Sequence, residues 1–303
     1  NWEKLGLLYP VKQNKDRHPK LLTHASNPVA IKIDNASIFR IFYSGRDKNN
    51  CSSIGAVDID FANLKILKDY YEPFFVFEEK YQYFSHGISI GDLQEINNNR
   101  YIFFMGWQIP PYSHWRGDIG RLKITNKNTL QLADEDPILK VDQIDRISFS
   151  YPSLIKHNGV FNMFYGSTIS WDSINGEMIH VINRATSEDG KNWKKLGLAI
   201  PYEIGKAQAF SRPTILKNPN STFTMWFSYR SGNNDLYKIG SANSDDLEKW
   251  HLNLDSNIIK TSKKGWDSEM VEYPFVFKDK EKTYMLYNGN SFGKDGFGLA
   301  VHK

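Results

Sequence analysis

Short apolar and aromatic runs, separated by polar turns rich in Gly, Asn, Asp and Ser, recur along the whole chain. Four of these runs open on a proline that follows one or two polar or aromatic residues, at Pro28, Pro152, Pro213 and Pro274. The intervals are 213 − 152 = 61, 274 − 213 = 61 and 152 − 28 = 124, which is twice 62. A copy that has lost its proline is therefore expected near position 90, where 85–90 reads SHGISI. Apolar runs this short, bounded by turn residues, predict β-strands.

A second aromatic run and a smaller third run follow each proline anchor. Five units of about 61 residues account for the chain, because 5 × 61 = 305 against 303 residues. This repeat predicts an all-β fold, a five-bladed β-propeller with four-stranded blades, in a single domain that spans residues 1–303. The second runs begin at Ile41, Ile102, Met163, Met225 and Met285, and the third at Ile54, Ile119, Ile182, Ile239 and Gly298.

The N-terminus supplies the strand that the last unit lacks. Residues 2–10 (WEKLGLLYP) resemble 193–201 (WKKLGLAIP), which ends the third unit. We therefore expect the N-terminal strand to pair with the last blade and close the ring, which removes exposed sheet edges. The acidic segments 187–193 and 244–250, each ending in Trp, are interpreted as structural hairpin turns on the outer rim.

Composition and charge exclude several classes of function. The formal net charge is 38 − 34 = +4 over 303 residues, a weak electrostatic footprint for a nucleic-acid partner. No stretch approaches the roughly 20 apolar residues of a membrane span. The single Cys51 excludes an intrachain disulfide framework. Because the histidines show no metal-ligand spacing and no Gly-rich phosphate loop is present, we expect no metal and no cofactor. With no signal peptide visible in a chain that starts at Asn1, a cytoplasmic location is expected, and the oligomeric state is left open.

Propeller geometry predicts where a binding site would lie. The first strand of each blade runs beside the central channel, and the second strand returns to the same face. Residues before each anchor and after each second run should therefore meet at one mouth of the channel, where we expect a carbohydrate or sugar-derived small molecule to bind. The candidate substrate-binding residues are His24, Asn27, Arg46, His86, Trp107, Trp115, Tyr151, Arg212, Arg230, Asp267, Asn288 and Asn290.

Asp47, Glu272 and Glu269 are the candidate catalytic carboxylates. Cleavage of a glycosidic bond usually needs two carboxyl groups, one that protonates the leaving oxygen and one that acts as base or nucleophile. Asp47 has the structural alternative of pairing with Arg46 or capping a turn. Glu272 precedes a buried strand, so it should meet a cation such as Arg212 or bind ligand. Glu269, like Asp267, has the alternative of being merely solvated.

The remaining candidates favour a sugar ligand but keep structural alternatives. Arg212 and Arg230 suit an anionic group on the ligand, or pair internally with Glu272 and Asp267. Trp107 and Trp115 suit stacking on the apolar face of a sugar ring. The structural alternative is that both rings are buried between blades. The two histidines, at 24 and 86, are expected to bind ligand hydroxyls or transfer protons, or to be satisfied structural residues.

These residues resemble a known superfamily. Residues 211–214 (SRPT) with 225–230 (MWFSYR), and 266–274 (WDSEMVEYP) with 287–290 (YNGN), are similar to the five-bladed β-propeller glycosidases. These are the arabinanase, xylosidase, invertase and levansucrase relatives of glycoside hydrolase families 43, 32 and 68, together with an uncharacterised branch associated with bacterial surface polysaccharides. The resemblance covers the whole chain and implies the same fold.

The resemblance leaves the activity open. In the families named above, an Asp beside the first-blade proline is nucleophile or base, and here Asn27 stands there. The second-blade Asp is replaced by Ser85 or Ser89, with Asp92 out of register. The resemblance therefore implies either a glycoside hydrolase or transglycosidase acting on a bacterial sugar, which could be anionic, or a noncatalytic glycan or nucleotide-sugar binding propeller in surface-polysaccharide assembly.

Overall fold

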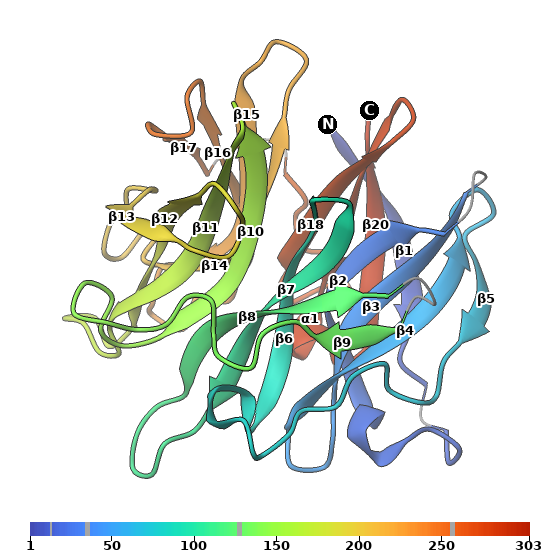
Figure 1. Cartoon of the computed structure of the whole chain (residues 1–303). Helices are drawn as coiled ribbons and strands as arrows, with labels where there is room; N and C mark the ends of the chain where they lie inside the picture. The colour runs from blue at the N-terminus through green and yellow to red at the C-terminus, as the bar shows by residue number, and fades with distance from the viewer. Residues whose placement is uncertain (13, 34–36, 126–128, 255–257) are drawn as a thin grey trace.

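The computed structural model describes residues 1–12, 14–33, 37–125, 129–254 and 258–303. Nearly all of its regular structure is β-strand (Figure 1), which confirms the all-β prediction. The described strands fall into five successive antiparallel groups of four, and Figure 1 shows these groups following one another around the molecule. The first four groups are β2 (Thr23–Lys32), β3 (Ile38–Arg46), β4 (Ser52–Asp60) and β5 (Lys65–Asp69); β6 (Gly87–Ile96), β7 (Asn99–Gln108), β8 (Arg116–Ile124) and β9 (Leu130–Leu132); β10 (Phe149–His157), β11 (Val160–Ser170), β12 (Ile179–Ser187) and β13 (Lys194–Leu198); and β14 (Ala209–Lys217), β15 (Phe223–Arg230), β16 (Lys238–Ser244) and β17 (His251–Asn253).

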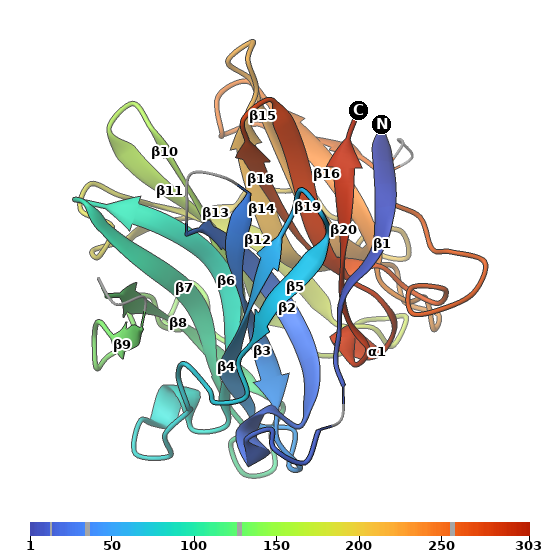
Figure 2. The same ribbon diagram turned by 90° about the vertical axis from the view of Figure 1, so that its right-hand side faces the viewer.

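The fifth group joins the two ends of the chain. Its strands are β18 (Glu272–Asp279), β19 (Lys282–Asn288), β20 (Gly296–His302) and the N-terminal β1 (Trp2–Pro10). Strand β1 pairs antiparallel with β20, from Trp2 opposite His302 to Pro10 opposite Gly296, and the termini lie side by side in Figure 2. The predicted pairing of the N-terminal strand with the last unit is therefore confirmed. Three short helical segments are described: η1 (Pro19–Leu21), η2 (Gln82–Phe84) and α1 (Asn290–Gly293).

The first strands of the groups pack against one another in a closed cycle. Strand β2 contacts β6, β6 contacts β10, β10 contacts β14, β14 contacts β18, and β18 contacts β2 again. The hydrogen-bonded sheets themselves are open, so strand pairing does not make this cycle. Each first strand is therefore in contact with the first strands of the two adjacent groups, an arrangement in which the repeats can present residues to a common site.

A bulge interrupts each first strand at its repeat anchor. In β2, Ser26 lies opposite Ser44 and Val29 opposite Phe42, so two residues face one. The residue before each proline takes the left-handed conformation, with φ of 55° at Asn27 and 45° at Arg212. In β6 the bulge falls at Gly91, and 152 − 61 = 91, so this glycine stands where the other repeats have proline. A Cβ at position 91 would collide with the backbone of Pro152 in the neighbouring first strand, a close approach that only glycine permits.

The core lies between successive groups and repeats with them. One buried aromatic of each second strand occupies the same register position, and each of these rings is at most 1% exposed. Burying a ring of this size contributes about 1.5–3 kcal/mol to stability. These equivalent rings are Tyr43, Phe104, Tyr165, Phe227 and Tyr287.

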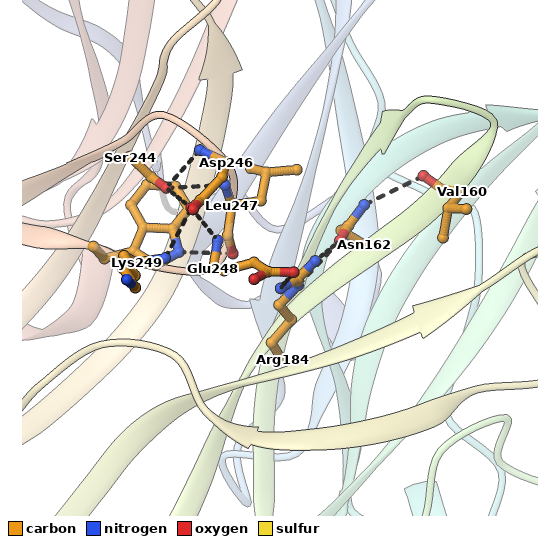
Figure 3. Close-up of polar contacts among 9 residues, drawn as sticks. Val160, Asn162, Arg184, Ser244, Asp246, Leu247, Glu248 and Lys249 are labelled. Atoms are coloured by element: carbon orange, nitrogen blue, oxygen red, sulfur yellow. Dashed lines mark hydrogen bonds and ion pairs between the residues drawn. The ribbon is translucent and has the colours of Figure 1, made fainter.

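The acidic segment after β16 is a structural turn at the edge of its group (Figure 3), as predicted. The Asp246 carboxylate accepts the backbone N–H groups of Glu248 and Lys249 at 2.8 and 2.9 Å. Arg184 of β12 donates to the Asn162 side chain at 2.8 Å and lies 3.7 Å from the Glu248 carboxylate. The segment therefore connects the third group to the fourth through Glu248, and the protein engages the Asp246 carboxylate.

Candidate functional site

A cavity of about 530 Å³ lies where the first strands begin and the second strands end. Residues of all five groups line it, which agrees with the prediction that the repeats converge on one opening. Six predicted site residues are part of this lining: Asn27, Arg46, Trp107, Trp115, Tyr151 and Arg230.

Strand register places one equivalent residue of each first strand beside this cavity. Just before the bulge, the five positions carry Ser26, Ser89, Ser150, Ser211 and Glu272, opposite Ser44, Met105, Gly166, Ser228 and Asn288 of the second strands. The four serines line the cavity. The fifth position carries the Glu272 carboxyl, which is fully buried and is not part of the cavity lining.

Glu272 is fully buried, and neither of its carboxyl oxygens has a hydrogen-bond partner. Burial raises the pKa of this carboxyl well above its ordinary value, and the charges of Arg46 and Arg230 only partly oppose the shift. The predicted ion pair with Arg212 is absent from the described contacts. Glu272 therefore holds its proton to higher pH than an exposed glutamate, which is the state that a proton donor needs.

Arg212 has a structural role instead. Its fully buried guanidinium donates to the carbonyl oxygens of Tyr273 and Pro28 at 2.6 and 2.7 Å. It thereby ties β14 to both β18 and β2 at the centre of the cycle of first strands. Burial lowers the pKa of Arg212 to about 9, against the opposing charges of Tyr151 and Asp92. The expectation that Arg212 faces a ligand or Glu272 is not met.

Arg46 and Arg230 are the two charged residues of the described cavity lining. Within the described residues, the Arg46 side chain makes neither a hydrogen bond nor an ion pair. Arg230 donates to Glu177 at 2.9 Å and lies over the Tyr237 ring, while its Nε has no partner. The side-chain nitrogen of buried Asn27 also lacks an acceptor. The Arg230 Nε and the Asn27 amide nitrogen are buried, so among the described lining residues Arg46 is the cation whose side chain has no protein partner.

Asp47 follows the structural alternative. One oxygen accepts the backbone N–H groups of Asn49 and Cys51, at 2.9 and 3.0 Å. The other oxygen pairs with Lys20 at 3.0 Å, rather than with Arg46. Asp47 therefore caps the turn between β3 and β4, and the lining of the cavity does not include it.

The two acidic residues of the loop before β18 point away from the cavity. Asp267 pairs with Lys4 at 2.7 Å and accepts the Tyr287 hydroxyl at 3.1 Å. Glu269 is exposed and lines a separate surface hollow with residues such as Val271. The structure thus does not bring Glu269 and Glu272 together as a catalytic pair.

Two of the three predicted asparagines, Asn288 and Asn290, hydrogen-bond backbone groups near the site. Asn288 accepts the Asn27 backbone N–H at 2.9 Å and donates to the carbonyls of Ala25 and Gly296. Asn290 accepts the backbone N–H of Glu269 at 2.8 Å and donates to the Gly265 carbonyl at 3.0 Å. Both amides are occupied by protein groups, so they position backbone rather than ligand.

The predicted histidines flank the opening. His24 is partly buried, and burial together with the nearby Arg46 lowers its pKa to about 4. Its Nδ1 lies 2.8 Å from the Thr23 hydroxyl. His86 lies 5.9 Å from Trp107, between ring centroids. Neither histidine is part of the cavity lining, although each is adjacent in space to a residue that is.

Aromatic rings form one wall of the cavity. The Trp107 indole donates to the Ser52 hydroxyl at 2.9 Å, which fixes the plane of the ring. Trp115 lies 5.0 Å from Trp171, edge to face. Flat rings held in this way suit the apolar face of a sugar.

His180 lines the cavity but was not predicted from the sequence. Its two ring nitrogens lie 2.6 Å from the Ser150 hydroxyl and 2.8 Å from that of Thr168. Burial, with a contribution from Arg230, lowers its pKa to about 3. The sequence prediction considered the starts of first strands and the ends of second strands, but not the starts of third strands. His180 lies at the start of a third strand and pairs with the first strand of the next group, as Ser52 does in the first group.

The described residues were compared with the requirements of a metal site and of a membrane-spanning helix. Among the described residues, no three His, Cys, Asp or Glu side chains gather in a way that could hold a metal ion. No helix in the described ranges has the length and apolar character needed to cross a bilayer.

Comparison with solved structures defines the class of the fold. The chain superposes with a TM-score of 0.76 on a protein described as a glycoside hydrolase, at 14% identity, over 99% of this chain and 91% of the other. A glycosyl hydrolase from Bacteroides ovatus gives 0.73 at 14% identity, over 100% and 93%. A structure titled for the GH130 family of mannoside phosphorylases and glycoside hydrolases gives 0.68 at 13% identity, over 100% and 94%. The chain therefore shares the fold of these glycoside hydrolase structures.

Two curated relatives narrow the assignment. The uncharacterized proteins Rv1502 and MT1551 of Mycobacterium tuberculosis are each 33% identical over 302 residues, which covers 99% of this chain and 98% of each relative. The chain belongs to the same family as these two mycobacterial proteins. No protein-family model matches it.

Proposed function

We propose that this protein is a carbohydrate-active enzyme that cleaves or transfers a glycosidic bond, with Glu272 as the proton donor. The observation that carries the proposal is the buried Glu272 carboxyl, which occupies the first-strand position where the other four groups have a cavity-lining serine. Burial raises its pKa, and it has no hydrogen-bond partner among the described residues. In this proposal the five strand groups are the blades of one propeller domain, residues 1–303, and the cavity is the mouth of its channel. The proposed substrate is a bacterial sugar.

The cavity offers groups for each part of a sugar. Trp107 and Trp115 would stack on the apolar face of a ring, while the serine hydroxyls before the bulges would bind its hydroxyl groups. Glu272 would protonate the departing glycosidic oxygen, a contribution of about 10²–10⁴ in rate. A volume of about 530 Å³ is in the range of small-molecule sites, about 300–1,000 Å³.

The test uses the leaving group. Oligosaccharides from bacterial surface polysaccharides have poor leaving groups that need protonation, whereas nitrophenyl glycosides of the same sugars have good ones. Glu272→Gln should slow cleavage of the oligosaccharides about a thousandfold and cleavage of the nitrophenyl glycosides far less. The exposed Glu203 provides the matched control, because Glu203→Gln should leave both rates unchanged. Equal losses on the two substrate classes would exclude a proton-donor role.

The second candidate function is noncatalytic binding of a glycan or nucleotide sugar. Asn27 favours it, because an amide cannot act as base or nucleophile where the related families carry Asp. It predicts sugar binding by calorimetry with no new reducing ends after long incubation. Release of reducing sugar by the wild type, and not by Glu272→Gln, would exclude it.

A further inference from the structure

A second cavity lies at the opposite end of the strands from the cavity described above. Its volume is about 660 Å³, and its lining comes from the hairpins β14–β15 and β18–β19 together with β1, β16 and β20. The two chain termini meet at this end of the molecule (Figure 2). The eight residues of β18 separate the two ends, a length of roughly 25 Å. The second cavity is therefore a separate place for a ligand to bind.

Two tryptophans form an apolar wall of the second cavity. Trp2 of β1 and Trp226 of β15 lie 6.0 Å apart between ring centroids, with their planes at 86°. Both rings are partly exposed, and both pack against the buried cluster that contains Val276 and Met285. The core thus holds the two rings in place while part of each remains accessible. Flat rings fixed in this way suit the apolar face of a sugar.

Polar groups of the fourth strand group lie beside these rings. Thr224 and Trp226 are two residues apart on β15, so their side chains share one face of the strand. The side-chain oxygen of Asn243 on β16 accepts the Thr224 hydroxyl at 2.9 Å. This contact orients the exposed Asn243 amide, whose nitrogen has no acceptor in the part of the chain that the structure describes. An oriented amide next to an indole ring suits a ligand that carries hydroxyl groups.

The charged side chains of the second cavity are mainly cationic. Lys278, Lys280 and Lys282 belong to its lining, and all three are exposed. Glu281 is the one acidic residue of the described lining. Lys278 donates to the Lys217 carbonyl at 3.1 Å, whereas Lys280 and Lys282 form no ion pair within the described ranges. A negatively charged ligand would therefore find ammonium groups that the protein does not already use.

We propose that the second cavity binds an acidic glycan, with a sugar ring against the tryptophans and its carboxylate or phosphate substituents against the lysines. A neutral sugar would use the tryptophan wall alone, and a small anion would use the lysines alone. A glycan that carries negative charge uses both. The proposal goes beyond the proposed function, because binding in the second cavity requires no chemistry at Glu272.

Electrophoresis in native gels that contain a dissolved polysaccharide tests the site. The acidic probes are polygalacturonate, which carries carboxylates, and phosphomannan, which carries phosphates. Their neutral counterparts are methyl-esterified polygalacturonate and mannan. At least one acidic polymer should retard the wild-type protein more than its neutral counterpart does, and added salt should reduce the retardation. The polymer that retards the protein shows whether carboxylate or phosphate is recognised. No retardation by either acidic polymer, or equal retardation by the neutral ones, would overturn the proposal.

Variants locate the binding in the second cavity. Replacing both Lys280 and Lys282 by Gln should weaken binding about tenfold, the effect of two exposed charge contacts. The melting temperature should not change, because neither lysine has an ion pair to lose. The matched control replaces Lys263 and Lys264 by Gln, since both are exposed and lie outside the linings of the two cavities. It removes the same charge and should bind as the wild type does. Equal losses in the two double variants would mean that only total charge matters, and would overturn the proposal.

The tryptophan wall has its own variant. Trp226→Leu keeps an apolar side chain against the buried cluster but removes the flat ring, so it should weaken binding about tenfold. Should this variant fail to fold, the exposed lysines still test the site. Unchanged binding by a folded Trp226→Leu would show that the ring does not contact the glycan and would overturn the proposal.

A variant of the first cavity separates this proposal from the proposed enzyme. Trp107 lines the first cavity, so Trp107→Ala should leave binding in the second cavity intact. Retardation that is lost in Trp107→Ala and kept in the Lys280 and Lys282 double variant would place the glycan in the first cavity and overturn the proposal. A protein that cleaves oligosaccharides but is retarded by no acidic polymer would refute the second site alone. Retardation without cleavage of any substrate would refute the proposed enzyme and keep the second site.

Discussion

Two buried carboxyls on first strands, Asp92 in β6 and Glu272 in β18, have opposite surroundings. Asp92 is 6% exposed and Glu272 is 0% exposed. The Asp92 oxygens accept the backbone N–H groups of Leu93 and Leu154 at 2.8 and 2.7 Å. No group of the described residues donates a hydrogen bond to Glu272. The two buried carboxyls thus differ in their partners: Asp92 ties β6 to β10, whereas the Glu272 oxygens have no hydrogen-bond partner among the described residues.

The same difference is visible in their pKa values. Burial raises the pKa of both carboxyls, but at Asp92 the Leu154 and Leu93 N–H groups stabilise the charged form. At Glu272 only the charges of Arg46 and Arg230 oppose burial. A buried carboxyl with backbone donors is a structural acceptor, and one without them is available for chemistry.

The largest expected effect is on the stability of an Asp92 variant. Asp92→Ala leaves the Leu93 and Leu154 N–H groups without acceptors, so we expect a loss of about 3 kcal/mol in the free energy of unfolding, measured in urea. Asp92→Asn keeps one acceptor oxygen and should lose less. Glu272→Gln breaks no protein hydrogen bond and should be at least as stable as the wild type at neutral pH. If Glu272→Gln lost as much as Asp92→Ala, the distinction between the two carboxyls would fail.

The second prediction concerns how stability depends on pH. In the unfolded chain Glu272 ionises near its ordinary value of 4.5, whereas the folded protein keeps the proton to higher pH. The unfolded state therefore binds fewer protons above pH 4.5, and wild-type stability relative to Glu272→Gln should fall as pH rises, by at most about 1.4 kcal/mol per pH unit. Urea titrations of both proteins between pH 4 and 8 measure this difference. A constant difference would show that Glu272 ionises as an exposed glutamate does.

Two histidines give the opposite dependence of stability on pH in both the wild type and Glu272→Gln. The pKa of His180 is lowered to about 3 and that of His24 to about 4, from 6.5. The unfolded state then binds more protons below pH 6.5, so stability is lost as pH falls through this range. Because the wild type and Glu272→Gln share both histidines, subtraction removes this contribution and isolates that of Glu272.

The repeat made much of the fold and the opening predictable. The 61-residue interval located the first strands, and Gly91 stands at the position that the interval assigns to the lost proline. Asn27, Tyr151 and Arg230 reached the cavity because they flank strands whose order follows from the repeat. Periodicity determines where along a strand a residue lies, and hence which face of the molecule it is near.

Partners of individual side chains could not be predicted in the same way. Asp47 and Glu272 both flank the opening in the sequence, yet Asp47 is used by a turn and Lys20 while Glu272 is unpartnered. Which partner a side chain finds depends on β-bulges, since one extra residue changes the face of the strand on which the next side chain lies. It also depends on contacts between residues that are far apart in the chain. Arg212 reaches the Pro28 carbonyl across 184 residues, a distance in sequence that no local pattern reports.

The smallest expected effect compares two serines at equivalent places in the ring before the bulges. The Ser150 hydroxyl lies 2.6 Å from the His180 Nε2, whereas the Ser211 hydroxyl makes no hydrogen bond to the described residues. Ser150→Ala leaves a buried ring nitrogen unpaired and should cost about 1 kcal/mol. Ser211→Ala should change the free energy of unfolding by less than about 0.5 kcal/mol.

Urea unfolding of the two variants at pH 7.5 measures this pair, because His180 is neutral there in the folded and the unfolded chain. The two substitutions remove the same atom from the same register position, so backbone propensity and the loss of a hydroxyl cancel in their difference. What remains is the contact with His180. Equal losses in the free energy of unfolding would mean that the hydrogen-bond partner of a buried polar group does not determine its contribution to stability. The contrast drawn between Asp92 and Glu272 would then lose its physical basis.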